Sequence, residues 1–502
     1  MRRSRLALVL VLLAALMLAG GCTRNAVDGA GKGTALRIGA TASPDSMDPT
    51  TNTEAAIPQA LLYNVYETLV KLDGEGNIRP LLASAWTESK DGLTYTFTLQ
   101  GGLTFASGTP VTAQDVVASL QRIQTDPAVV ATYKTIMANA TSITAPDAKT
   151  VVVTLAKPSN NWLYAMTGPM GIIIDPAGLG SLTTQPAGSG PYTLKTWNKG
   201  ESVVLAKNPA YWGTAGRFDT VTFQYYADPS AENAAMLSGG LDIISILAAP
   251  QALGQFADAS RFQVVKGTST GEIVLGFNHA RTPLANAAVR QAICYGIDRQ
   301  ALLDSVWAGQ GLLIGSMVPP TDPWYQDLSG AYPYDPAKAK DLLAQAGYGS
   351  GLSLTLTVPT YPYATGSEQF LVSQLGQIGI TVTVKELDFA QWYDQVFTQG
   401  DYDMTIVDHA EPRDIVNWAD PSYYWHYDNP QFQQLISQAD QASPADQVTL
   451  MQQAAQILSD DAAGSFLWLM PNLIVATPDL TGLPANQVGY SFDVTTIASK
   501  NG

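Results

Sequence analysis

A short apolar run near the middle of the chain is followed by a helical repeat of apolar positions. The run Ile273–Phe277 lies between polar neighbours, and so short a run favours a buried strand over a helix. After a turn at Pro283, Asn286 is a typical N-cap residue, and apolar side chains recur at i, i+3, i+4, i+7 and i+8 from Val289 to Ile297. One face of this predicted helix should therefore pack against a large core.

Strand and helix patterns alternate through the second half of the chain. A helix is predicted after Asp335, because Pro336 suits its first position and Gly347 stands just past its end. Apolar residues alternate with Ser and Thr from Leu352 to Val358, which is typical of a strand. The same patterns predict two further helices and two further strands: helices over 366–377 and 389–398, and strands over 381–387 and 402–408. Such alternation is typical of an α/β fold with a mostly parallel sheet.

The first half of the chain also has clear local signals. Thr112 and Asp115 have the spacing of a capping box that starts a helix. Asp91-Gly92 is a strong turn signal before an alternating strand that ends at Leu99. The remaining predicted elements of this half are strands over 35–40 and 150–155 and helices over 57–69 and 231–239.

The N-terminus has the features of an export signal. Three arginines precede an apolar run from Leu6 to Leu18. The stretch Leu18–Cys22 is similar to a lipoprotein signal box, in which the cysteine is lipidated and becomes the first residue of the mature protein. We therefore expect a signal peptide over 1–21, lipidation at Cys22 and a Gly-rich, flexible tether over 22–34. An ordinary cleaved signal is the alternative.

Composition narrows the classes of function. The chain has 502 residues, 46% of them hydrophobic, which is enough for more than one domain. Three of its 27 cationic residues lie in the predicted leader, so the remaining 24 stand against 43 acidic residues, a net charge of −19. That excess argues against nucleic acid and against adsorption to anionic lipid. With Cys22 lipidated, Cys294 has no cysteine partner and is expected to be a core thiol.

No motif for catalysis or metal binding stands out. The sequence lacks the His-Glu-x-x-His and Cys-x-x-Cys motifs, and it lacks a phosphate loop. Its three histidines, His279, His409 and His426, match no known chelate spacing. We therefore predict no metal site and no cofactor.

A series of short motifs carries a family resemblance. The series is Tyr63-Asn64-Val65-Tyr66-Glu67-Thr68-Leu69, Gly108-Thr109-Pro110-Val111-Thr112-Ala113, Gly188-Ser189-Gly190-Pro191-Tyr192, Lys207-Asn208-Pro209-Ala210-Tyr211-Trp212 and the segment from Asn278 to Asp298. In this order the motifs resemble the family 5 solute-binding proteins of bacterial ABC importers, the group that includes the dipeptide, oligopeptide and nickel binders. The resemblance covers nearly all of residues 35–480.

The resemblance implies a fold and a domain organisation. The implied fold is α/β, a two-lobed periplasmic-binding-protein-like fold of class II type, with an extra small α+β domain inserted in lobe I. Lobe I would comprise residues 35–75, 187–277 and 478–502. The inserted domain would comprise residues 76–186, and lobe II residues 278–477.

The loop after the predicted strand 402–408 concentrates acidic and aromatic residues. Loops 358–363 and 408–420 should both face a cleft, because ligand loops lie at the carboxyl ends of parallel strands. The resemblance implies that a carboxylate of the second loop pairs with the N-terminal ammonium of a peptide, and either Glu411 or Asp414 could take that role. The alternative is an ion pair of Arg413 with one of these acids. The other candidates on this loop are Asp408 and Trp418.

Further candidate residues lie outside that loop. Dipeptide binders have an arginine for the cargo carboxylate after the strand that matches 352–358, whereas this chain offers Tyr361 and Tyr363 there. Trp392 could stack on cargo, although an aromatic at a helical position is more often part of the core. Thr51 and Thr53 follow an Asp-Pro pair, after which the chain of this family faces the cleft.

Together these features predict a lipid-anchored, extracytoplasmic solute-binding component of an ABC importer. It would capture di- or oligopeptides between its lobes, close around them and deliver them to the permease subunits. We expect a monomer that is held at the membrane by its lipid, binds no nucleic acid and is not an enzyme. The alternatives are a receptor for an oligosaccharide or other small solute, a secreted hydrolase with Glu411 and Asp414 as paired carboxylates, and an adhesion or signalling receptor.

Overall fold

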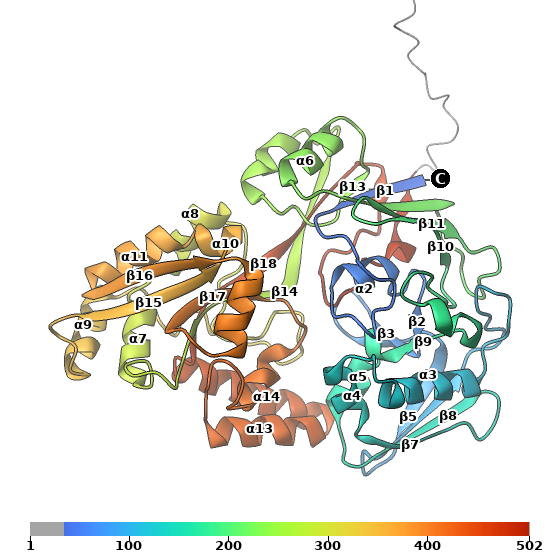
Figure 1. The fold of residues 1–502 in the computed structure, drawn as a ribbon, viewed down its shortest axis with the longest axis horizontal. Coiled ribbons are helices and arrows are strands. Elements are labelled where there is room, and N and C mark those ends of the chain that lie inside the picture. The colour runs from blue at the N-terminus through green and yellow to red at the C-terminus, as the bar shows by residue number, and fades with distance from the viewer. Residues whose placement is uncertain (1–34, 501–502) are drawn as a thin grey trace, which may run out of the picture.

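Two lobes joined by two long strands make up the protein, whose computed structural model describes residues 35–500 (Figure 1). β14 (Gln263–Phe277) and β18 (Gly464–Ala476) pair antiparallel and pass from one lobe to the other. Their register shifts between Thr268 and Glu272. Within residues 35–500, no helix has both the length and the apolar character needed to cross a bilayer. The predicted signal peptide, the lipidation site Cys22 and most of the tether lie outside the described residues.

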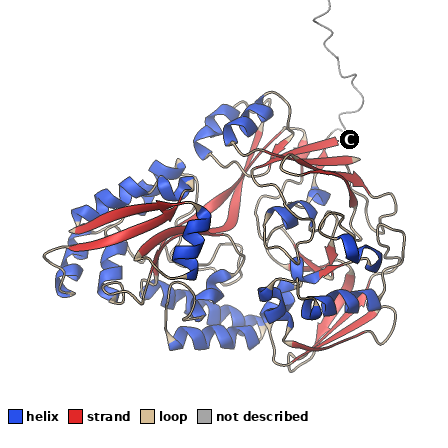
Figure 2. Cartoon of the chain, in the orientation of Figure 1, coloured by secondary structure: helices blue, strands red, loops and turns tan. Residues whose placement is uncertain are grey.

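One ten-stranded sheet runs through both lobes, in the order β10, β11, β12, β1, β13, β18, β14, β17, β15 and β16 (Figure 2). In the first lobe, β1 lies parallel to β12 and to β13. The elements of this lobe are β1 (Ala35–Ala40), α2 (Ala56–Leu61), β10 (Tyr192–Asn198), β11 (Ser202–Lys207), β12 (Thr220–Tyr225), α6 (Pro229–Leu237) and β13 (Ile243–Ile244). The strand predicted over 35–40 is thereby confirmed.

The second lobe contains the predicted parallel strands. β15 (Leu352–Pro359) lies between β16 (Ile380–Leu387) and β17 (Met404–His409), parallel to both. The helix predicted over 389–398 begins as α12 (Phe389–Trp392) and continues as the π-helical turn η4 (Tyr393–Thr398). The other helices are α7 (Ala287–Tyr295), α8 (Arg299–Trp307), α9 (Pro336–Gln345), α10 (Pro362–Thr365), α11 (Glu368–Gln377), α13 (Pro430–Gln441) and α14 (Pro444–Asp460).

Side-chain caps start two of these helices as the sequence predicts. The Asp335 carboxylate accepts a hydrogen bond from the Lys338 N–H at 2.9 Å at the start of α9. The Asn286 side chain accepts one from the Ala288 N–H at 2.9 Å at the start of α7. α7 ends before the predicted limit at Ile297, because Asp298 caps a separate helix, α8.

A separate four-stranded antiparallel sheet, in the order β5, β6, β8 and β7, lies beside the first lobe (Figure 1). The Asp91-Gly92 turn joins β5 to β6, and Gly92 has a φ of +69°. α3 packs on this sheet and begins with the predicted capping box, since the Thr112 N–H donates to Asp115 Oδ2 at 2.8 Å. The elements are β5 (Ala83–Glu88), β6 (Thr94–Leu99), α3 (Ala113–Thr125), α4 (Ala131–Met137), β7 (Ala140–Thr144), β8 (Thr150–Leu155) and α5 (Asn160–Ala165).

The helix predicted over 57–69 is wrong beyond Leu61. α2 ends there, Tyr63 has a φ of +65°, and the short strand β2 (Glu67–Thr68) follows. The Asn64 side chain donates to the carbonyl of Phe492 at 2.9 Å, so this segment bonds to residues more than four hundred positions away. Such tertiary hydrogen bonds outweigh the local helical pattern.

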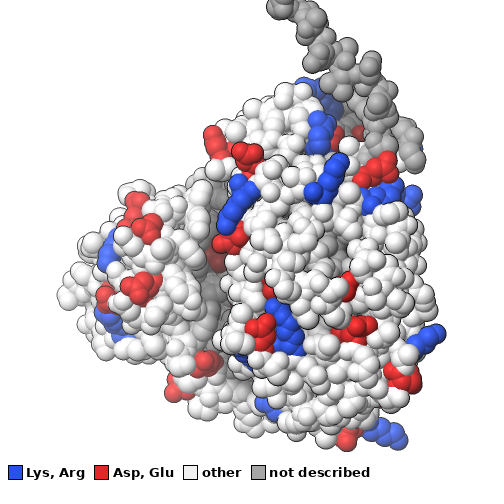
Figure 3. All heavy atoms as spheres, turned by 45° about the vertical axis from the view of Figure 1, so that its right-hand side comes forward, with Lys and Arg blue, Asp and Glu red and all other residues white. Residues whose placement is uncertain are grey.

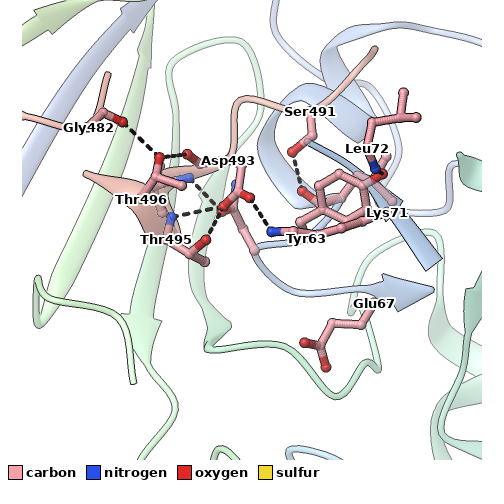
Figure 4. Close-up of polar contacts among 12 residues, drawn as sticks. Tyr63, Glu67, Lys71, Leu72, Gly482, Ser491, Asp493, Thr495 and Thr496 are labelled. Carbon is pink, nitrogen blue, oxygen red and sulfur yellow. Dashed lines mark hydrogen bonds and ion pairs between the residues drawn. The ribbon is translucent and has the colours of Figure 1, made fainter. Parts of the chain in front are cut away.

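The C-terminal segment returns to the first lobe (Figure 4). The Asp493 carboxylate accepts from Lys71 Nζ at 2.9 Å, and Lys71 belongs to β3 (Val70–Leu72). The Ser491 hydroxyl donates to the carbonyl of Leu62 at 2.5 Å. These contacts fix the segment that carries Tyr490.

Candidate functional site

Acidic side chains gather where β17 ends. His409 is the last residue of β17, and its Nδ1 lies 3.2 Å from Asp414 Oδ2 while its Nε2 lies 2.8 Å from the Tyr424 hydroxyl. Asp414 begins the 3-10 helix η5 (Asp414–Ala419) and is buried. Burial raises the pKa of Asp414, and the neighbouring His409 opposes that rise. This carboxylate is therefore held out of solvent beside a basic side chain.

Glu272 of β14 brings a further buried carboxylate to the same place. It lies opposite His409 in the strand register and is 2% exposed. Burial, followed by the charges of Asp414, Asp322 and Asp408, raises the pKa of Glu272 well above its usual value. The carboxylates of Glu272, Asp322, Asp408 and Asp414 thus lie close enough to one another to hinder each other's ionisation.

Asp322 and Asp408 are the other two members of that group of four. Burial raises the pKa of Asp322 to about 6, although the charge of Arg413 opposes this rise. Burial also raises the pKa of Asp408 to about 6, although the charge of His409 opposes it. A Cβ atom at Gly271 would lie 2.7 Å from Asp408 Oδ1. The glycine therefore leaves room for the Asp408 carboxylate.

Arg413 lies beside these carboxylates and also contacts a helix next to the four-stranded sheet. Its Nε lies 3.7 Å from Asp322 Oδ1, and its guanidinium lies 3.6 Å from the ring centre of Tyr164 and 4.7 Å from that of Trp324. Tyr164 belongs to α5, next to the four-stranded sheet, whereas Arg413 precedes η5 in the second lobe. The acid that pairs with Arg413 is thus Asp322, which lies outside the loop 408–420.

Glu411 lies near tyrosines that do not belong to the second lobe. Burial and then the charge of Glu411 raise the pKa of Tyr133, on α4, to about 12. Burial and then the charge of Glu411 also raise the pKa of Tyr490. Figure 3 shows that the surface is hollowed between the two lobes.

We name five carboxylates the acidic cluster. They are Glu272, Asp322, Asp408, Glu411 and Asp414. The structure thus brings together three of the predicted site acids, with Arg413 beside them. Within residues 35–500, no three His, Cys, Asp or Glu side chains are arranged to hold a metal ion.

The predicted aromatic residues divide between the interior and the surface. Trp418 is buried against Trp425, with ring centres 3.7 Å apart, and Trp392 is buried as well. Tyr361 is 42% exposed and stacks on the buried Tyr363, with ring centres 5.9 Å apart. Of these predicted site residues, Tyr361 therefore offers the most open ring.

Thr51 and Thr53 lie in the loop that follows β1. The Thr51 hydroxyl donates to the carbonyl of Asp48 at 3.4 Å, and the Asp48 carboxylate pairs with Arg122 at 3.0 Å. Thr53 is exposed. In the part of the chain that the structure describes, no hydrogen bond joins either threonine to the acidic cluster.

Sequence reasoning missed several residues of this region. Glu272 had a usable signal, because it follows the polar run Thr268–Gly271 inside an otherwise apolar strand, where a carboxylate is costly without a purpose. Asp322 and the tyrosines had none, since they stand on segments that only the tertiary fold brings near. These missed residues are Asp322, Tyr133, Tyr164 and Tyr490.

Comparison with known proteins establishes the family. Residues 77–434 match the family model described as bacterial extracellular solute-binding proteins, family 5 Middle. The chain belongs to this family. As a family 5 protein, it is the extracytoplasmic solute-binding component of an ABC importer.

Individual relatives and solved structures agree with that membership. The glutathione-binding protein GsiB of Escherichia coli O1:K1 is 31% identical over 351 residues, which are 68% of each chain. DppA from Helicobacter pylori, solved in complex with the peptide STSA, has a TM-score of 0.77 at 24% identity, covering 93% of this chain and 98% of that one. CtaP from Listeria monocytogenes has a TM-score of 0.81 at 22% identity, covering 93% and 99%. The predicted two-lobed α/β fold is thereby confirmed.

Proposed function

We propose that this family 5 protein captures peptides between its lobes and delivers them intact to the permease subunits of an ABC importer. The observation that carries the proposal is that acids of the second lobe lie near tyrosines from the rest of the molecule, as for Glu411 with Tyr133 and Tyr490. A buried carboxylate can hold the ammonium group of a peptide by a charge-assisted hydrogen bond. The names of GsiB, a glutathione binder, and of DppA with its bound peptide STSA support this cargo class.

Each predicted site residue has a proposed part in binding. Glu411 and Asp414 are the proposed partners of the peptide ammonium. Trp392 and Trp418 are buried, so we propose that they support the wall of the site and do not stack on cargo. The remaining proposed contacts are Asp408, Arg413, Tyr361, Tyr363, Thr51 and Thr53.

We also propose how the receptor is attached and organised. The lipoprotein signal over 1–21, lipidation at Cys22 and the tether over 22–34 would hold a monomer at the outer face of the cell membrane. The sheet β5-β6-β8-β7 with its helices supports an inserted domain over 76–186. Lobe I over 35–75, 187–277 and 478–502 and lobe II over 278–477 complete the proposed division.

Titration calorimetry with trialanine, glutathione and maltotriose tests the peptide proposal. We expect a peptide to bind, and mass spectrometry of the recovered ligand to show it uncleaved. A cleaved peptide would favour the hydrolase that pairs Glu411 with Asp414. Binding of maltotriose without binding of either peptide would favour an oligosaccharide receptor.

A further inference from the structure

The acidic cluster has more carboxylates than basic neighbours. Within residues 35–500, His409 and Arg413 are the only basic side chains at ion-pair distance from it. His409 Nδ1 lies 3.2 Å from Asp414 and Arg413 Nε lies 3.7 Å from Asp322. In that part of the chain, three members of the cluster have no basic side chain at ion-pair distance: Glu272, Asp408 and Glu411.

Buried carboxylate oxygens of the cluster also have no hydrogen-bond donor. Among the described residues, Glu272 Oε2, Asp322 Oδ2 and Asp408 Oδ1 are buried without a partner. The whole Glu272 residue is 2% exposed. Removing an ionised carboxylate from water costs several kcal/mol unless donors or an opposite charge replace the water. These oxygens therefore suit a ligand that brings N–H donors and positive charge.

We propose that the cargo of this receptor is a cationic solute with at least two positive groups, such as a peptide with lysine or arginine near its N-terminus. The inference rests on the proposed peptide receptor and names its substrate class. An ammonium group has three N–H donors and a guanidinium has five, which matches several unpartnered oxygens at once. A cation beside these acids favours their ionised form. One ammonium balances one carboxylate, so the three acids without a basic partner fit a cargo with more than one cation.

Arg413 has an acid and two aromatic rings as neighbours, and among the described residues its buried Nε has no hydrogen-bond partner. Its guanidinium lies between the rings of Tyr164 and Trp324, and its Nε faces Asp322. An acidic peptide such as glutathione would place its carboxylates near Glu272 and the other acids, where like charges repel. We therefore expect this receptor to discriminate against glutathione.

Aromatic rings near the cluster also suit a cation. Burial and then the charge of Asp408 raise the pKa of Tyr363, so this ring lies beside that acid. Tyr363 stacks on Tyr361, whose ring is 42% exposed. A cation that has lost its water is attracted to the face of such rings.

Cargo affinity should depend on pH, because cations bind the ionised carboxylates. The pKa of Asp322 and that of Asp408 lie at about 6, so both acids take up protons as the pH falls from 7.5 to 5.5. Affinity for a cationic cargo should fall over this range. The charged and titratable groups that face these two acids are Tyr164, Glu272, Tyr363, His409, Arg413 and Asp414.

Titration calorimetry of the purified protein with trilysine, trialanine, glutathione and spermidine tests the inference at pH 7.5 in about 0.15 M salt, where exposed charges are screened. We expect trilysine to bind at least tenfold more tightly than trialanine, and glutathione to bind most weakly. Trialanine or glutathione binding as tightly as trilysine would overturn the inference.

Neutral replacements inside the cluster give the matched comparison. Asp408→Asn and, separately, Glu272→Gln should each weaken trilysine binding at least tenfold and weaken trialanine binding much less. A cooperative urea unfolding transition shows that both variants are folded. The control is Glu232→Gln, which removes a buried carboxylate without hydrogen-bond partners on α6 of the first lobe. An equal loss in the control, or no loss in both cluster variants, would contradict the inference.

The two proposals fail in different ways. If spermidine binds and no peptide does, the cationic cargo stands and the peptide receptor fails. If trialanine binds and trilysine binds no more tightly, the peptide receptor stands and the cationic cargo fails. If neither trilysine nor spermidine binds, the cationic cargo is overturned.

Discussion

Buried carboxylates in this protein differ in what compensates for the loss of water. Glu67 accepts hydrogen bonds from Ser189, Tyr211 and Trp212 at 2.7, 2.7 and 2.9 Å, so its oxygens are satisfied within the fold. Glu232 has no donor for either oxygen among the described residues. The acidic cluster lies between these cases, because His409 and Arg413 compensate only part of it. We therefore assign Glu67 to structure, and this difference supports the proposal that the cluster binds cargo.

Alanine at both Glu411 and Asp414 should weaken trialanine binding more than tenfold. The peptide ammonium would lose its carboxylate partners, and a tenfold loss corresponds to about 1.4 kcal/mol. Titration calorimetry measures the change. The control replaces two exposed acids of the second lobe, Asp304 and Asp341, with alanine. An affinity within about twofold of the parent protein would show that the proposed ammonium site is wrong.

Glu232→Gln should stabilise the protein at pH 8 and have little effect at pH 5. Burial raises the pKa of Glu232 from 4.5 to about 7, so the folded state holds this proton more tightly than the unfolded state. Stability is therefore lost as the pH rises from 4.5 to 7, by at most about 3 kcal/mol. Glutamine removes that dependence. Chemical denaturation at both pH values measures it, and an equal effect at pH 5 and pH 8 would contradict the assignment.

Glu67 also acts on the scale of whole elements, because its donors stand on the two loops that flank the β10–β11 pair. Ser189 lies just before β10, while Tyr211 and Trp212 follow β11. One carboxylate thereby fixes β2 against both loops. The motifs that carried the family resemblance, around Glu67, Ser189 and Tyr211, meet at this point.

Tyr211→Phe should cost about 2 kcal/mol at pH 8 and less at pH 6. Hydrogen bonds to charged acceptors are worth about 1.5–3 kcal/mol, and burial raises the pKa of Glu67 to about 7, so the charged acceptor is fully present only above that pH. The control is Tyr226→Phe, whose hydroxyl donates to the neutral side chain of Gln224 at 2.9 Å. Urea unfolding compares the two variants. A cost for Tyr211→Phe that does not change with pH would refute the charged bond.

Elements set by local chemistry were predictable from the sequence. The capping box at Thr112, the cap at Asp335 and the turn at Asp91 depend on residues a few positions apart. The helix predicted over 57–69 failed because Asn64 and Glu67 bond to distant segments. The loop 408–420 could be predicted because it follows a strand of a parallel sheet, where ligand loops lie. The tyrosines near Glu411 could not be predicted, because they come from parts of the chain that meet only in the folded protein.

At the scale of the whole molecule, the second lobe touches the region of the four-stranded sheet. α13 lies next to α5 (Figure 1). The Asp440 carboxylate accepts from the Ser159 hydroxyl at 3.0 Å and from the Asn161 N–H at 2.8 Å. The Asn160 side chain donates to the carbonyl of Ala442 at 2.9 Å. Since these bonds span two bodies joined by β14 and β18, they exist only while the lobes are together.

Asp440→Ala should therefore weaken cargo binding by roughly five- to hundredfold, although Asp440 is not one of the proposed cargo contacts. Loss of two hydrogen bonds removes about 1–3 kcal/mol from the closed state alone, and apparent affinity falls with the fraction of molecules able to close. Titration calorimetry measures affinity, and small-angle scattering should show a larger radius without cargo. Asp341→Ala, an exposed acid on α9, is the control. If Asp440→Ala changed neither the affinity nor the radius, the Asp440 hydrogen bonds would not stabilise the closed state, and cargo affinity would depend on contacts within the cleft alone.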